Sequence, residues 1–196
     1  MKSFLANVDI RSIMPLIDIT NDSCFPSAAV SRQVKQNGGE KNEGAITGNC
    51  RNKKQFYDYS NTYHRYACKA PGNKKHAFDH VIVWTTDGKV THGSTATLGP
   101  KAAADIPKDG QRLKFVYYKN TNYSFRFAKN GEAVQNPYGK YVSLVVDSWY
   151  PLPGAIIDGL NMFDYSPAVM PIKNSVFLTK STSLVQRDTR SLTKRA

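Results

Sequence analysis

The sequence predicts an α+β fold, with a helix near the N-terminus and antiparallel β-strands in the rest of the chain. Three features lead to this prediction: residues that begin and end a helix between positions 22 and 39, a β-hairpin signal between 79 and 95, and three alternating strand patterns between 112 and 149. A chain of 196 residues can bury a substantial core as one domain. No apolar run reaches the roughly 18 residues of a membrane-spanning helix, so we expect no membrane span.

The first 20 residues contain two apolar clusters, Phe4-Leu5 and the run from Ile13 to Ile19. Because Pro15 interrupts any long helix, we expect a short helix or strand here that packs on the core. Asp9 and Arg11 interrupt the apolar stretch that a secretory signal needs. The sequence therefore predicts a protein without a signal peptide that is cytoplasmic when made. Export would then follow a leaderless route or delivery as an effector or phage protein.

The predicted helix follows Cys24. Asp22 or Ser23 can cap its N-terminus, Pro26 suits its first turn, and Asn-Gly-Gly at 37–39 ends it. The unpaired N–H groups and the dipole at that end would lower the pKa of the Cys24 thiol and, beside Asp22 and Ser23, supply part of an oxyanion hole. The three cysteines are odd in number and widely spaced, so we expect a working thiol rather than a disulfide framework. A small buried cysteine beside a helix is the alternative.

A β-hairpin is predicted around Asp87-Gly88, the dipeptide that a type I′ turn prefers. Its arms cover residues 81–84 and 89–92. His80 and His92 lie at the outer ends of the arms, so we expect the turn to bring the two imidazoles together. With the upstream cysteine they suggest a nucleophile, its base and the residue that orients the base. Two half-exposed strand histidines are the alternative.

Residues 40–78 are polar, basic and rich in tyrosine, which is typical of a surface excursion with its aromatic rings turned inward. Stacking of the rings on bases or sugars is the alternative. We expect Tyr63 and Trp84 to contact the substrate. Cys50, His64, Cys68 and His76 could be considered as a zinc site, but they lack the closely spaced pair of ligands that such a site usually has. We therefore predict no metal and no cofactor.

The second half of the chain predicts a continuous antiparallel meander. Its strand patterns lie at residues 112–119, 123–128 and 140–149. Prolines at positions 151, 153, 167 and 171 of the remaining segment exclude long regular elements, and a basic Ser/Thr-rich tail ends the chain. We therefore divide the chain into a domain of residues 1–150 and a C-terminal extension of residues 151–196.

The net charge of +12 is concentrated in two stretches. Residues 32–75 carry +7 and residues 173–196 carry +5, whereas the remainder balances. A basic surface of this kind raises the rate of encounter with anionic polymers such as nucleic acid, wall teichoic acid or acidic lipid. Solubility alone is the alternative explanation.

A cysteine that opens a helix, followed by a histidine that begins a strand, resembles the NlpC/P60 branch of the papain-like cysteine hydrolases. The strands concerned read His80-Val81-Ile82-Val83-Trp84 and Val90-Thr91-His92-Gly93-Ser94. The resemblance implies a papain-like fold with Cys24 as nucleophile, His80 as general base and His92 as the orienting residue. It also implies a peptidase or amidase that cleaves an amide bond, most often in peptidoglycan stem peptides, without metal or cofactor.

A hypothesis of a different class is a non-enzymatic, β-rich nucleic-acid-binding or viral capsid-like protein. Such a protein would bind phosphates through the basic stretch at 32–75 and the C-terminal tail. The two hypotheses differ in what must converge in space. The hydrolase needs Cys24, His80 and His92 together, and the binding protein needs its lysines and arginines together.

Overall fold

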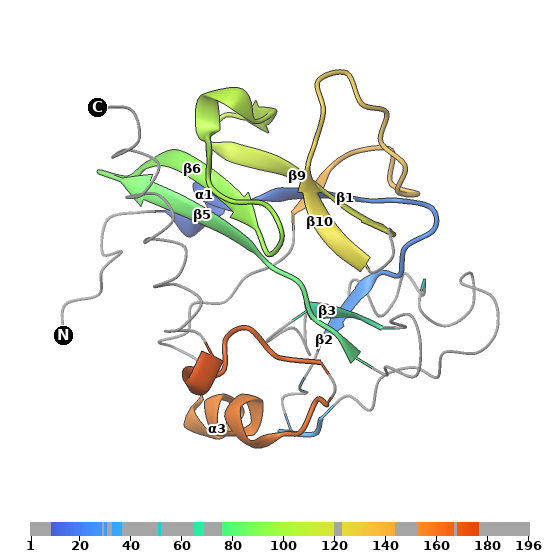
Figure 1. The fold of residues 1–196 in the computed structure, drawn as a ribbon, viewed down its shortest axis with the longest axis vertical. Helices are drawn as coiled ribbons and strands as arrows, with labels where there is room; N and C mark the ends of the chain where they lie inside the picture. Colours follow the sequence, from blue (N-terminus) through green and yellow to red (C-terminus); the bar gives the residue numbers. More distant parts are fainter. Residues whose placement is uncertain are drawn as a thin grey trace.

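The computed structural model describes residues 9–28, 30, 33–36, 51, 65–68, 76–119, 123–143, 153–166 and 168–176. β-Strands dominate this part of the chain, and its helices are short (Figure 1). The strands are β1 (Leu16–Ile19), β2 (Pro26–Ala28), β3 (Arg65–Cys68), β4 (His76–Ala77), β5 (Val81–Thr86), β6 (Lys89–Thr95), β7 (Lys101–Ala102), β8 (Lys108–Asp109), β9 (Arg112–Lys119), β10 (Tyr123–Phe127) and β11 (Val142–Ser143). The helices are α1 (Ile10–Ile13), the short 3-10 helix η3 (Ala103–Asp105) and α3 (Gly154–Met162).

The central sheet has the strand order β10-β9-β1-β11, with β8 paired to β9. β9 and β10 form an antiparallel pair, which confirms the two strands predicted from the alternating pattern. β1 runs parallel to β9, with Ile17 opposite Phe115. All four residues of β1 are buried, as expected for an apolar strand paired on both edges. The predicted continuous meander is therefore wrong, because a strand from the beginning of the chain lies between β9 and β11.

The predicted hairpin is confirmed, since β5 and β6 pair on either side of Asp87-Gly88. Both turn residues have positive φ, 50° at Asp87 and 74° at Gly88, as a type I′ turn requires. The inner face of the hairpin packs on the central sheet. A β-carbon at Gly93 would come within 2.7 Å of Leu113 Cδ1, so the two sheets approach closely at this glycine.

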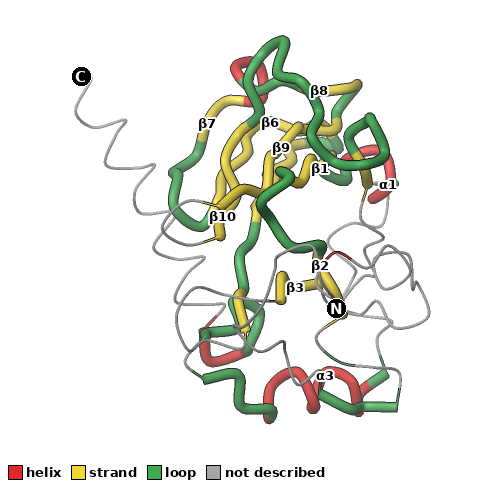
Figure 2. Tube along the Cα trace, turned by 90° about the vertical axis from the view of Figure 1, so that its right-hand side faces the viewer, coloured by secondary structure: helices red, strands yellow, loops and turns green. Residues whose placement is uncertain are grey.

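One hydrophobic core joins the central sheet to α3, which lies at the end of the molecule opposite β7 and β8 (Figure 2). Ile19 of β1 and Phe115 of β9 belong to the same buried cluster as Leu160 of α3. The helix also approaches an N-terminal segment closely, because a β-carbon at Gly159 would lie 2.8 Å from Val34 Cγ1. α3 is therefore held by contacts with segments from the first half of the chain.

The predicted helix at 22–39 is wrong. Residues 26–28 form strand β2, and Val30 and Gln36 form a β-bridge around a turn in which Val34 has a φ of 58°. β2 pairs with β3, so its backbone hydrogen bonds go to a distant strand, and a valine in the left-handed region cannot continue an α-helix. The papain-like α+β architecture, with a nucleophile helix on an antiparallel sheet, is replaced by a mostly β fold. The division of the chain at residue 150 stays a prediction.

Candidate functional site

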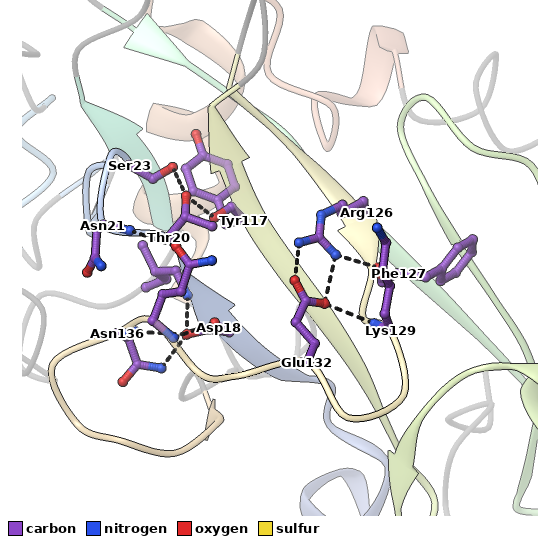
Figure 3. Close-up of polar contacts among 12 residues, drawn as sticks. Asp18, Thr20, Asn21, Ser23, Tyr117, Arg126, Phe127, Lys129, Glu132 and Asn136 are labelled. Atoms are coloured by element: carbon purple, nitrogen blue, oxygen red, sulfur yellow. Dashed lines mark hydrogen bonds and ion pairs between the residues drawn. The ribbon is translucent and has the colours of Figure 1, made fainter.

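A buried carboxylate organises the loops at the end of β1 where the chain leaves the central sheet. Asp18 is only 1% exposed. Its Oδ1 accepts hydrogen bonds from the backbone N–H of Ile19 at 2.8 Å and from the backbone N–H and Nδ2 of Asn136 at 3.0 and 2.6 Å (Figure 3). Its Oδ2 accepts one from the backbone N–H of Gln135 at 3.0 Å. Asp18 therefore fixes the 128–141 loop against the sheet.

A second carboxylate holds the same loop from the other direction. Glu132, on the loop, pairs with both terminal nitrogens of Arg126 on β10 (Figure 3). The hydrogen bond with Arg126 holds the pKa of Glu132 below its usual value and raises the pKa of Arg126. The guanidinium also lies 5.4 Å from the centre of the Tyr118 ring. The 128–141 loop is therefore held by two carboxylates: Asp18 of β1, which binds the loop backbone, and Glu132 of the loop, which binds Arg126 of β10.

The turn that follows β1 is closed by a guanidinium. Arg51 donates hydrogen bonds to the backbone carbonyls of Thr20 and Ser23, and its guanidinium lies 4.6 Å from the centre of the Phe25 ring. Burial lowers the pKa of Arg51, while Asp22 nearby acts in the opposite direction. Thr20 Oγ1 bonds to Asp22 Oδ1 at 2.6 Å and to Ser23 Oγ at 2.8 Å. Arg51 is therefore a structural cation that fixes the turn.

These loops bring together polar side chains and two aromatic rings, of which that of Phe25 is buried. We call this set, Asn21, Asp22, Phe25, Arg51, Gln135 and Tyr138, the β1 loop cluster. Asp22 is exposed, and its Oδ2 has no hydrogen-bond partner among the described residues. Asn21, which precedes it in the chain, and Gln135 are also exposed, and the backbone N–H of Asn21 lies 3.5 Å from Gln135 Oε1. Tyr138 is half-buried, its ring centre 6.3 Å from that of Phe25.

This arrangement suits a small polar ligand with hydroxyl groups. A carboxylate accepts hydrogen bonds or pairs with a cation, the two amides both donate and accept, and an aromatic ring covers an apolar surface. Small-molecule sites usually combine apolar surface with a few well-placed polar groups of this kind. Among the described residues, no three His, Cys, Asp or Glu side chains gather as a metal site would require.

The predicted nucleophile is absent. Cys24 is fully buried and disulfide-bonded, so it carries no thiol that could become a thiolate. Its partner is one of the other two cysteines, Cys50 and Cys68. The prediction of a working thiol at Cys24 is therefore wrong. Of its predicted neighbours, Ser23 is buried and Asp22 is exposed, and both belong to the turn that Arg51 closes.

The two histidines do not face each other. His92 lies opposite Trp84 in the β5–β6 ladder, whereas the backbone carbonyl of His80 accepts a hydrogen bond from the Ala96 N–H at 3.1 Å. The four-residue offset along β5 separates the two levels by about 13 Å. The prediction failed because β6 continues beyond His92 to Thr95, so His92 lies within the strand rather than at its outer end. Hence the structure brings together no triad.

Two other predicted sites depend on side chains that the structure does not describe. Tyr63 lies outside the described residues, so its contact with a ligand stays a prediction. Trp84 is described and half-buried, and its contact with a ligand also stays a prediction. Cys50 and His64, half of the disfavoured zinc set, also lie outside them. Sequence reasoning missed Arg51, Gln135 and Tyr138, which reach the β1 loop cluster from distant parts of the chain.

The fold and the site define a class: a disulfide-bonded, mostly β protein with a cluster of polar side chains beside β1 and no cysteine catalytic centre among the described residues. The family model described as necrosis inducing protein (NPP1) matches residues 9–73 and 68–182. These matches cover most of the chain. The chain therefore belongs to the necrosis-inducing (NPP1) protein family.

Known proteins agree with this assignment. NLP effector protein 2 of Phytophthora capsici is 26% identical, and the match covers 81% of this chain and 72% of the relative. Necrosis-inducing protein NPP1 of Phytophthora nicotianae is 25% identical, and the match covers 85% of this chain and 77% of the relative. Among solved structures, NLPPya in complex with mannosamine has a TM-score of 0.70 at 20% identity, covering 89% and 88% of the two chains. The non-toxic HaNLP3 protein has a TM-score of 0.66 at 21% identity, covering 88% and 87%. The structural likenesses establish a shared fold.

These findings correct the predicted function. The chain is not an NlpC/P60 thiol protease or amidase, and a peptidoglycan substrate has no support. The alternative of a nucleic-acid-binding or capsid-like protein is likewise replaced by the family assignment. Of the expected descriptions, only that of an effector agrees with the relatives. No helix within the described ranges is both long and apolar enough to cross a bilayer.

Proposed function

We propose that this protein is a necrosis-inducing effector that acts on plant cells and recognises a sugar through the β1 loop cluster. The observation that carries the proposal is the family match, which extends from residue 9 to residue 182. A solved relative with a TM-score of 0.69 is described as a toxin fold for microbial attack and plant defence. Because the non-toxic HaNLP3 shares this fold, toxicity must depend on the surface rather than on the fold alone.

The ligand that fits the β1 loop cluster is an amino sugar. NLPPya has been solved in complex with glucosamine and with mannosamine. The two sugars share an ammonium group beside neighbouring hydroxyls and differ in configuration at the carbon that carries the nitrogen. In our chain, Asp22 would pair with the ammonium group, the amides of Asn21 and Gln135 would bond to hydroxyls, and the Tyr138 ring would cover the C–H face.

The net positive charge of the chain and the negative charge of Asp22 in the β1 loop cluster favour different partners. A net charge of +12 attracts the protein to anionic surfaces over long distances and repels small cations. An ammonium-bearing sugar therefore needs a local carboxylate, which Asp22 supplies. The disulfide at Cys24 further supports action in an oxidising environment outside the producing cell.

Substituting Asp22→Asn should weaken glucosamine binding by about tenfold or more, since a hydrogen bond to a charged group contributes about 1.5–3 kcal/mol. The asparagine keeps an oxygen to accept from Thr20, so the turn should stay folded. Binding is measured by NMR titration with glucosamine and with N-acetylglucosamine, whose amide nitrogen is uncharged. The wild type should bind glucosamine more tightly than N-acetylglucosamine, and Asp22→Asn should bind the two sugars equally.

The matched control is Asp109→Asn, which removes an exposed carboxylate on β8 and should leave glucosamine binding unchanged. Equal glucosamine affinity for wild type and Asp22→Asn would remove Asp22 from the site. Failure of the wild-type protein to bind either sugar would reject the sugar proposal itself.

A further inference from the structure

The turn after β1 carries a short motif that the functional argument has not used. Asn21-Asp22-Ser23 has the form Asn-x-Ser, which accepts N-linked oligosaccharides when the middle residue is not proline. Asn21 is exposed, as an asparagine that carries a bulky oligosaccharide must be in the folded protein. The sequence contains one other such triplet, Asn122-Tyr123-Ser124, whose asparagine lies outside the described residues. The structure therefore bears on the first triplet alone.

The side-chain amide of Asn21 does not hold the fold together. The one hydrogen bond that Asn21 makes among the described residues uses its backbone N–H, which donates to Gln135 Oε1 at 3.5 Å (Figure 3). Asn136 provides the contrast, because it is only 4% exposed and its Nδ2 donates to Asp18 Oδ1 and to a backbone carbonyl. Attaching a sugar to Nδ2 of Asn21 therefore breaks no hydrogen bond in the described part of the chain.

The serine of the motif is accessible only before the turn folds. Ser23 is 0% exposed, its Oγ lies 2.8 Å from Thr20 Oγ1, and its backbone carbonyl accepts a hydrogen bond from Arg51. An oligosaccharide transferase recognises this serine together with the asparagine, so the transfer has to precede the closing of the turn by Arg51. The neighbouring Cys24 is disulfide-bonded, which agrees with passage of the chain through an oxidising secretory compartment, where such transfer takes place.

We propose that Asn21 is an N-glycosylation site and that its oligosaccharide covers the β1 loop cluster. The donor is a lipid diphosphate that carries an oligosaccharide. Nδ2 of Asn21 bonds to the anomeric carbon, the bond from that carbon to the diphosphate oxygen breaks, and Nδ2 loses one proton as the lipid diphosphate leaves. Because Asn21 precedes Asp22 and its N–H lies beside Gln135, the glycan stands where the amino sugar would bind. This covering of the sugar site rests on the proposed function, whereas the glycosylation itself does not.

Mass spectrometry of the full chain, secreted from yeast, tests the glycosylation site. Peptide N-glycosidase in heavy-oxygen water converts a glycosylated asparagine into an isotope-labelled aspartate, so the labelled peptide identifies the acceptor. We expect the label at position 21 in the wild type. Asn21→Gln should remove this label, whereas the matched control Asn122→Gln, which removes the other triplet, should keep it. An unlabelled Asn21 in the secreted wild-type protein would overturn the proposal.

Titration with glucosamine tests the covering of the β1 loop cluster. The glycosylated protein is compared with the same chain made in the oxidising periplasm of bacteria that attach no such oligosaccharide. The glycosylated form should bind glucosamine about tenfold or more weakly, because the oligosaccharide is bulky and excludes other ligands around Asn21. Equal affinity of the two forms would overturn the covering. If neither form binds glucosamine, the sugar proposal fails, and the isotope label alone still decides whether Asn21 is glycosylated.

Discussion

Replacing Asp18 with alanine is expected to lower the free energy of unfolding by about 3–5 kcal/mol. The carboxylate is buried and accepts four hydrogen bonds from Ile19, Gln135 and Asn136. Removing the carboxylate leaves these N–H donors buried without this acceptor, and an unsatisfied buried donor lowers the stability of the folded state. The loss is large beside the total stability of a typical domain, about 5–15 kcal/mol.

Urea unfolding, followed by tryptophan fluorescence, measures this loss. Glu132→Gln is the matched control, because it neutralises a carboxylate of the same loop that is partly exposed. Its pairing with Arg126 is screened by solvent, so we expect a loss of about 1 kcal/mol or less. A change at Asp18 no larger than that at Glu132 would show that Asp18 does not hold the loop.

Removing the disulfide at Cys24 is expected to cost a similar amount, about 2–5 kcal/mol. The bond restricts the unfolded chain, and Cys24 itself is fully buried in the core cluster. Reductant should therefore lower the urea midpoint of the wild type. Cys24→Ser should show the lowered midpoint without reductant.

The variant also supplies the control, because adding reductant to Cys24→Ser should change its midpoint no further. A thiol assay in denaturant gives an independent count. One disulfide among three cysteines leaves one free thiol per wild-type chain. Three reactive thiols, together with a midpoint that reductant does not move, would contradict the disulfide.

Local signals in the sequence predicted the local elements correctly. Asp87-Gly88 admits the positive φ values of a type I′ turn, and this turn pairs β5 with β6. The spacing of Leu113, Phe115 and Tyr117 at every second position marks β9, where all three side chains are buried. In both cases the deciding interactions lie within a few residues, so a pattern in the sequence is enough to find them.

Long-range interactions decided the elements that were predicted wrongly. Asp22, Ser23 and Pro26 fit a helix start, but proline is equally acceptable as the first residue of a strand. Pairing with β3 selected the strand, and no signal near Pro26 shows that β3 lies beside it. The parallel placement of β1 next to β9 is hidden for the same reason.

The β1 loop cluster was only partly visible for a related reason. Asp22 was named for its place beside Cys24, whereas its actual neighbours include Arg51 and Tyr123, whose pKa is raised by burial and by Asp22. These three residues come from widely separated segments of the chain. Contacts between segments far apart in the sequence, such as those of Arg51 with the carbonyls of Thr20 and Ser23, bring them to one place.

Electrolyte leakage from leaf tissue treated with purified, disulfide-bonded protein tests the central claim most directly. We expect wild type and Asp109→Asn to release electrolytes to a similar extent, and Asp22→Asn to release much less at the same concentration. Absence of leakage with folded wild-type protein would contradict the assignment as a necrosis-inducing effector. Full leakage with Asp22→Asn would contradict the role of the β1 loop cluster.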